Sequence, residues 1–99
     1  MNSDEPRLLY VEDEALVALV VAMSLEEAGF EVQLAADGVE AIKALDEGAS
    51  NFHALVTDVR LPEVDGWNIA RHARKLNATL PVVYVSEDSA SQWAAKGVP

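Results

Sequence analysis

The stretch LLYVEDEALV, residues Leu8–Val17, joins a short apolar run to three acids and then returns at once to apolar residues. A short run that is apolar throughout is typical of a strand buried on both faces of a sheet. Glu12, Asp13 and Glu14 follow this run directly. Like charges beside a buried strand carry a high desolvation and repulsion energy unless something neutralises them, so the stretch raises the question of what neutralises these acids.

Working outward from this stretch, apolar segments alternate with segments of helical periodicity. Strands are expected at 7–11, 30–36, 53–58 and 81–86. Helices are expected at 14–29, 37–48, 67–76 and 89–97. Asp37 stands three residues before Glu40, which indicates a helix N-cap with a capping-box partner, and Gly29 and Gly48 stand where helices end.

Each of the first three helices has an apolar face that we expect to pack inward. In the first helix these residues are Leu16, Leu19, Val20 and Met23. In the second helix they are Val39, Ala41, Ile42 and Leu45. In the third helix they are Ile69, Ala70, Ala73 and Leu76.

The alternation of strands and helices predicts an α/β fold, a doubly wound parallel sheet with helices on both faces. Right-handed crossovers place the carboxyl ends of all strands at one edge, and ligands bind there where the strand order reverses. The 99 residues are expected to form one domain, 1–99.

Composition excludes several classes of function. The chain has no cysteine, which rules out disulfides and thiolate chemistry. Its net charge of -10 makes direct binding to nucleic acid or to an anionic membrane unfavourable. No apolar run is long enough to span a bilayer, and the polar start MNSDEPR is not a signal peptide. We therefore expect a cytoplasmic protein.

Acids also mark the end of the third strand, where Asp58 follows an apolar run. If the first and third strands are neighbours, Glu12, Asp13 and Asp58 converge on one crevice. Mg²⁺ would neutralise such a cluster, because it prefers oxygen ligands. Arg60 and Arg7 are the only basic residues close enough in sequence to do so instead.

A carboxylate beside Mg²⁺ can act as a nucleophile toward phosphorus. A hydroxyl at the same edge would hold the phosphoryl oxygens, and Ser86, at the end of the fourth strand, is placed to supply it.

At this point the chain resembles a two-component response regulator receiver domain. The resemblance rests on Glu12-Asp13, on VTDVRLPEVDGW around Asp58, and on PVVYVS ending in Ser86. It implies a flavodoxin-like (βα)5 fold with strand order 2-1-3-4-5. It also implies that Asp58 is phosphorylated by a histidine kinase or a histidine phosphotransfer protein in a Mg²⁺-dependent reaction.

The same resemblance implies a role for each site residue. Glu12 and Asp13 would hold Mg²⁺ together with Asp58, with Asp13 the more direct ligand. Arg60 would offer its backbone carbonyl to the metal. Ser86 would be the switch hydroxyl that moves toward the phosphoryl group. The first helix would also serve as a docking surface for the kinase or phosphotransfer helix.

The family pattern continues into a fifth strand, a lysine and a fifth helix, which are absent from this sequence. We therefore expect a C-terminally incomplete receiver. Without those elements the fourth strand would be an open apolar edge, and Val17, Val21 and Leu25 would be uncovered. A chain complete at this length is expected to form a homodimer or a swapped assembly through that strand, or to be poorly soluble.

Simpler interpretations stand beside these. The three acids could cap the first helix, and Ser86 could cap the last one. His53 and His72 are expected to be ordinary residues, and Arg71, Arg74 and Lys75 a solvated helix face. The alternative function is a receiver-like interaction scaffold that is not phosphorylated. A phosphotransferase enzyme is not expected, since Arg60, two positions after Asp58, gives no general acid or base there, and the short chain leaves no room for a substrate cap.

Overall fold

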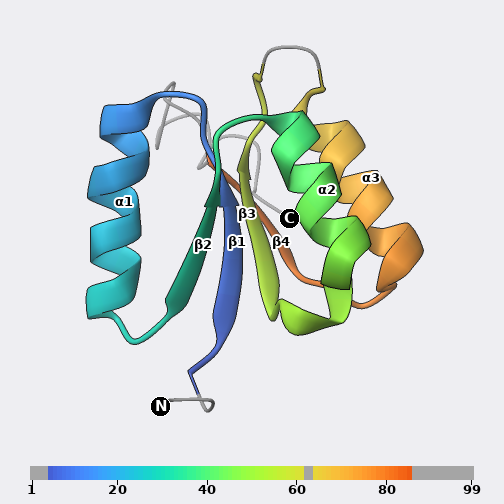
Figure 1. The fold of residues 1–99 in the computed structure, drawn as a ribbon, viewed down its shortest axis with the longest axis horizontal. Coiled ribbons are helices and arrows are strands. Elements are labelled where there is room, and N and C mark those ends of the chain that lie inside the picture. Colours follow the sequence, from blue (N-terminus) through green and yellow to red (C-terminus); the bar gives the residue numbers. More distant parts are fainter. Residues whose placement is uncertain (1–4, 62–63, 86–99) are drawn as a thin grey trace, which may run out of the picture.

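The computed structural model describes residues 5–61 and 64–85, which form a parallel α/β fold (Figure 1). Its elements in chain order are β1 (Arg7–Val11), α1 (Ala15–Glu27), β2 (Glu31–Ala35), α2 (Gly38–Gly48), a 3-10 turn η1 (Ala49–Asn51), β3 (Ala54–Asp58), α3 (Gly66–Leu76) and β4 (Val82–Val85). The predicted strands and the first three helices are confirmed to within two residues at each end. The helix expected at 89–97 lies outside the described residues.

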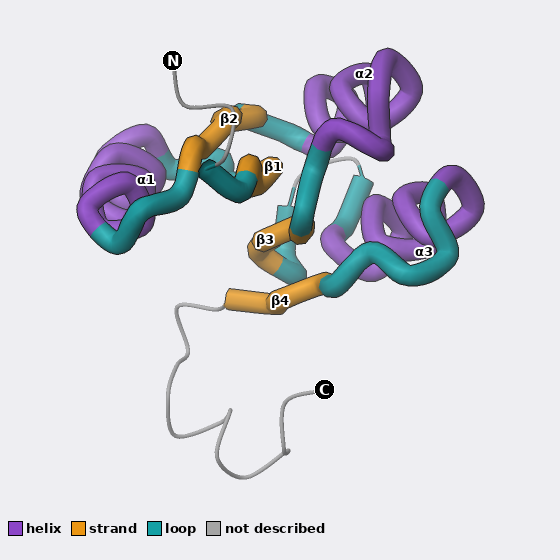
Figure 2. Tube along the Cα trace, turned by 90° about the horizontal axis from the view of Figure 1, so that it is seen from below, coloured by secondary structure: helices purple, strands orange, loops and turns teal. Residues whose placement is uncertain are grey.

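The strands form one sheet in the order β2-β1-β3-β4, and each neighbouring pair is parallel. In the ribbon and tube views, α1 covers one face of the sheet, whereas α2 and α3 cover the other (Figures 1 and 2). This is the flavodoxin-like arrangement implied by the resemblance to receiver domains. The strand order reverses between β1 and β3, so the carboxyl ends of these two strands flank the switch point.

The core is divided by the sheet into two clusters, because alternate side chains of a strand point to opposite faces. The larger cluster lies between the sheet and α2 and α3, and includes Leu9, Val11, Leu45, Leu55 and Ile69. The smaller cluster lies on the α1 side and consists of Leu8, Tyr10, Ala18 and Val56, with partly buried neighbours.

The expectation for the inward face of α1 was wrong. Leu16, Leu19, Val20 and Met23 are 73%, 54%, 58% and 52% exposed. Instead, Ala18 and Ala22 are buried, and Val21 and Leu25 pack against the smaller cluster. Apolar residues of α1 lie on all sides of the helix, so their periodicity does not define one inward face. The small side chains of Ala18 and Ala22 allow the helix to approach the sheet closely.

The orientation of α1 also changes which of its apolar residues are exposed, compared with the prediction. Val21 and Leu25 were expected to be uncovered, but they are partly buried against the sheet, and Val17 has intermediate exposure. The exposed apolar face of α1 is the set Leu16, Leu19, Val20 and Met23.

On the other side of the sheet, the helix faces follow the prediction except at Ile42, which has intermediate exposure, and at two exposed residues. Ala41 and Leu45 of α2, and Ile69, Ala70 and Ala73 of α3, are buried as expected. Val39 is 55% exposed and Leu76 is 49% exposed. Both lie at the ends of their helices, where the helix no longer covers the core.

The predicted start of α2 is confirmed by its hydrogen bonds. The Asp37 carboxylate accepts from the Glu40 N–H at 2.8 Å, and the Glu40 carboxylate accepts from the Ala36 N–H at 3.0 Å. This reciprocal pair satisfies amides that have no partner inside the helix.

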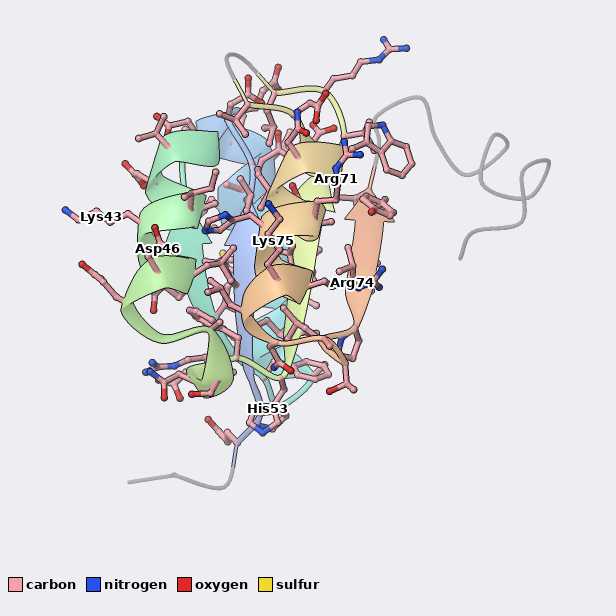
Figure 3. All side chains as sticks on the ribbon, turned by 90° about the vertical axis from the view of Figure 1, so that its right-hand side faces the viewer. Lys43, Asp46, His53, Arg71, Arg74 and Lys75 are labelled. Carbon is pink, nitrogen blue, oxygen red and sulfur yellow. The ribbon has the colours of Figure 1, made fainter. Side chains whose placement is uncertain are left out.

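The basic residues of α3 form an exposed surface, as expected. Arg71, Arg74 and Lys75 are exposed and lie along the outside of the helix (Figure 3). Together with Trp67, Ala70 and Tyr84 they line an open hollow of about 350 Å³ beside β4. None of the predicted site acids lines this hollow.

The two histidines have structural partners. His53 Nδ1 accepts from the Arg7 N–H at 3.0 Å, and His72 Nε2 lies 2.7 Å from Asp46 Oδ1, joining α3 to α2. These contacts agree with the expectation that both are ordinary residues.

Within the described ranges β4 pairs with β3 alone, and its Val83 is 39% exposed. Assembly through this strand remains a prediction. No helix in the described part of the chain is both long and apolar enough to cross a membrane.

Candidate functional site

The carboxyl ends of β1 and β3 bring three acids together. Val11 is in register with Thr57, so Glu12, directly after β1, lies level with Asp58, the last residue of β3. One carboxylate oxygen each from Glu12, Asp13 and Asp58 lie within 4.8 Å of one another. Glu12 and Asp58 are only 4% and 7% exposed, whereas Asp13 is exposed. The expected convergence of the three acids is therefore present.

Glu12 is held by a donor at each of its oxygens. Oε1 accepts from the Tyr10 hydroxyl at 3.3 Å, and Oε2 accepts from the Glu14 N–H at 3.2 Å. The backbone also fixes this residue, because the Glu12 N–H donates to the Ala35 carbonyl at 3.1 Å.

Asp58 is held by the turn that follows it. Its Oδ1 accepts from the Arg60 N–H at 3.2 Å. Its backbone carbonyl accepts from the buried Thr57 hydroxyl at 2.9 Å. These bonds keep the Asp58 carboxylate at the end of the strand, facing the acids that follow β1.

Gly66 explains why the turn after Asp58 ends in Asp-Gly. The Gly66 N–H donates to the Val59 carbonyl at 2.9 Å, and a Cβ at this position would collide with the Asp58 carbonyl oxygen. The Asp65 side chain caps α3 by accepting from the Asn68 N–H at 2.9 Å. Asp65 therefore starts the helix, while Gly66 lets the start of the helix press against the backbone of Asp58.

The electrostatics of the cluster make ionisation of its two buried carboxyls less favourable than usual. Burial raises the pKa of Glu12, and the charges of Asp58 and Asp13 raise it further. Burial also raises the pKa of Asp58, helped by Asp13 and opposed mainly by the Arg60 N–H. Burial and the Glu12 charge raise the pKa of Tyr10, so its phenol remains a neutral donor.

The donor set suits a hard divalent cation. Mg²⁺ takes oxygen ligands and keeps several waters, so a few carboxylates at one open edge are sufficient to hold it. Two of these three acids are buried, with raised pKa values, and a cation would relieve both their repulsion and their desolvation.

The simpler interpretation, that the acids cap α1, is not supported. The helix starts at Ala15, and its N-cap residue Glu14 makes no side-chain capping hydrogen bond. Glu12 instead accepts from the Glu14 N–H, which precedes the helix.

One of the two basic residues proposed to neutralise the acids is at the wrong end of the sheet. Arg7 begins β1 and pairs with Glu31, the first residue of β2, at 2.8 Å. Arg60 does lie beside the cluster, and its charge lowers the pKa of Asp58. Ser86 lies outside the described residues, so its role remains a prediction.

Sequence reasoning missed Tyr10 and the contact between Gly66 and Asp58. The signal for Tyr10 was available, because residues 8, 10 and 12 of an extended segment point to one face. The signal for Gly66 was only partial: Asp-Gly indicates a turn, but not which backbone the turn touches.

The fold and the site together define a doubly wound α/β domain with an acidic cluster at its switch point. The sequence profile of the family described as "Response regulator receiver domain" matches residues 8–98. The chain belongs to this family, whose members include domains of histidine kinases and of response regulators.

Individual relatives agree with this assignment. The sensor histidine kinase RcsC of Salmonella typhimurium is 30% identical over 91 residues, which are 92% of this chain and 9% of the relative. A response regulator receiver protein from Sinorhizobium medicae is similar in structure, with a TM-score of 0.81 and 38% identity over 97% of this chain and 77% of that one.

A third relative was solved with a ligand. The response regulator TrrA from Thermotoga maritima, in complex with Mg(2+)-BeF, has a TM-score of 0.78 and 26% identity over 91% of this chain and 75% of that one. Across the curated relatives given, this chain spans between 9% and 40% of the relative's length.

Proposed function

We propose that this domain is the phosphoacceptor of a two-component phosphorelay, phosphorylated on Asp58 by a histidine kinase or a histidine phosphotransfer protein. The observation that carries the proposal is the cluster of Glu12, Asp13 and Asp58 within 4.8 Å at the strand switch point. Membership of the receiver family supports it. A relative solved with Mg(2+)-BeF supports the choice of metal.

In the proposed reaction, the Asp58 carboxylate attacks the phosphorus of a phosphohistidine. A P–O bond forms, and the P–N bond breaks as the imidazole nitrogen keeps the electron pair. Glu12, Asp13 and the Asp58 carboxylate would hold the cation, with the Arg60 backbone carbonyl as a further ligand. Bound Mg²⁺ would offset the negative charge of the phosphoryl oxygens and carboxylates. Ser86 would hold a phosphoryl oxygen after transfer.

The turn after Asp58 prepares this carboxylate for the reaction. The Arg60 N–H donates to Oδ1, and Gly66 packs closely against the Asp58 backbone. A nucleophile held in place loses less entropy in the reaction than a mobile one.

The partner would dock on the exposed apolar face of α1, formed by Leu16, Leu19, Val20 and Met23. The start of this face lies near the acids, because α1 begins three residues after Glu12. An amphipathic helix of the partner is the expected ligand for such a surface.

The test is intact mass before and after treatment with acetyl phosphate and Mg²⁺. We expect the wild-type chain to gain one phosphoryl group and Asp58→Asn to gain none. Asp46→Asn is the matched control, because Asp46 is an exposed acid on α2 that pairs with His72, and it should be labelled like the wild type. No gain in the wild type, or an equal gain in Asp58→Asn, would contradict the proposal and favour a non-phosphorylated scaffold.

A further inference from the structure

Tyr10 is a buried polar residue that the proposed reaction does not use. Its side chain is 0% exposed and belongs to the core cluster on the α1 side of the sheet. Among the residues that the structure describes, its hydroxyl hydrogen-bonds to one group, Oε1 of Glu12, at 3.3 Å. Without that partner, the hydroxyl would be buried and unsatisfied, which destabilises a fold.

The contact also restrains Glu12. The Glu12 carboxylate lies between the Tyr10 hydroxyl on Oε1 and the Glu14 N–H on Oε2. The Tyr10 hydroxyl comes from β1, and the Glu14 N–H comes from the loop before α1. Together they fix the plane of the carboxylate, leaving each oxygen a further lone pair for a cation.

We propose that Tyr10 is a positioning residue for the metal site, orienting the Glu12 carboxylate toward the cation that Glu12, Asp13 and Asp58 would share. The inference rests on the proposed function, because it assigns a role at that same site. Tyr10 would act through Glu12 and not as a ligand of the cation.

The arrangement resembles the way proteins commonly tune metal ligands. A hydrogen-bond donor behind a ligating carboxylate fixes its orientation, and the loss of such a donor typically lowers metal affinity by about 10- to 100-fold. At 3.3 Å the Tyr10–Glu12 bond is long for a hydroxyl–carboxylate contact. We therefore expect an effect at the lower end of that range.

The experiment compares Mg²⁺ binding by the wild-type chain, Tyr10→Phe and Tyr84→Phe, using titration calorimetry without any phosphodonor. Phenylalanine keeps the ring of Tyr10 in the core and removes the hydroxyl. Tyr84 is the chain's other tyrosine and lies on β4 against Trp67. We expect about a 10-fold weaker affinity in Tyr10→Phe and an unchanged affinity in Tyr84→Phe.

A double-mutant cycle separates positioning from general destabilisation. If Tyr10 acts through Glu12, the effect of Tyr10→Phe on Mg²⁺ affinity should disappear in a Glu12→Ala background. Urea unfolding without Mg²⁺ measures the structural contribution of the hydroxyl separately. In the wild-type chain, the NMR signals of the Tyr10 ring should shift on adding Mg²⁺, and those of Tyr84 should not, which tests the proposal without any substitution.

The outcomes distinguish this inference from the proposed function. Wild-type affinity in Tyr10→Phe, or an effect that persists in Glu12→Ala, would overturn the positioning role and leave the phosphoacceptor proposal intact. A wild-type chain that binds no Mg²⁺ would overturn both.

Discussion

The acids of the site differ in how firmly the chain holds them. Glu12 and Asp58 are buried and accept hydrogen bonds, whereas Asp13 is exposed, and no hydrogen bond to its side chain is present among the described residues. Asp13 can therefore turn toward a cation without breaking an existing contact. This freedom fits the expectation that Asp13 is the more direct ligand.

Replacing Asp13 by alanine should therefore weaken metal binding with little effect on the fold. We expect Mg²⁺ affinity to fall at least roughly 10-fold, because one ligand of a small set is lost. The free energy of unfolding without Mg²⁺ should change by less than about 0.5 kcal/mol, as is usual for exposed sites. Calorimetric titration and urea unfolding would measure the two quantities.

The neighbouring acid provides the control for this substitution. Glu14 is also exposed, and only its backbone N–H contacts the site. Glu14→Ala should bind Mg²⁺ like the wild type. Equal losses in both variants would show that the local negative charge, and not coordination by Asp13, governs the affinity.

The start of helix α3 packs against the end of strand β3. Gly66→Ala should destabilise the fold by about 1–3 kcal/mol, because the new methyl group must displace the Asp58 carbonyl or the helix. The same displacement should reduce labelling of Asp58 by acetyl phosphate. Urea unfolding and intact mass are the measurements.

Gly48→Ala is the matched control for this glycine. A Cβ there would meet the amide of Asn51, whose exposed side chain can move away. Destabilisation and loss of labelling in Gly66→Ala no larger than in Gly48→Ala would contradict the proposed coupling between α3 and Asp58.

A substitution on the exposed face of α1 can test recognition of the partner separately from phosphorylation of Asp58. Leu19→Glu should slow phosphotransfer from a histidine kinase or phosphotransfer protein, because it places a charge on the proposed docking face. Labelling by acetyl phosphate should be unchanged, since that donor needs no docking surface. Transfer rates from a phosphorylated partner and from acetyl phosphate would be compared.

Val39→Glu is the control, because Val39 is 55% exposed and lies on α2, across the sheet from α1. It introduces the same charge away from the proposed surface. If both variants slow transfer equally, the net charge of the chain is responsible and the α1 docking surface is wrong.

Without a bound cation, the buried acids of the site should lower the free energy of unfolding of the whole domain. The pKa of Asp58 is raised above its ordinary value of 3.8, mainly by burial. Its contribution to stability is therefore fully present below that value and is lost as pH rises through the higher folded pKa. Asparagine removes the charge and can still accept the Arg60 hydrogen bond.

We therefore expect Asp58→Asn, without divalent cations, to be more stable than the wild type at pH 7. The difference should shrink as the pH falls through the raised folded pKa of Asp58, because the wild-type carboxyl then becomes neutral as well. Saturating Mg²⁺ should reduce or reverse it, because binding stabilises only the folded state. Unfolding curves over this pH range would test the sign, and a variant less stable than the wild type at pH 7 would contradict it.

The features that could be predicted from the sequence are mostly those that depend on residues close together in the chain. The apolar strands, the Asp37–Glu40 capping pair and the turn at Asp65-Gly66 depend on neighbours within a few positions. The convergence of Glu12, Asp13 and Asp58 was also predictable, because parallel strands with right-handed crossovers end at one edge. The order of the elements was therefore sufficient to locate the site.

The tertiary structure decided which side of each element faces inward and what lies behind the site. The apolar residues of α1 surround the helix, so only its packing against the sheet shows that Ala18 and Ala22 are buried. The same applies to the bond between Tyr10 and Glu12 and to the approach of Gly66 to Asp58. These features depend on distances between elements, which sequence periodicity does not contain.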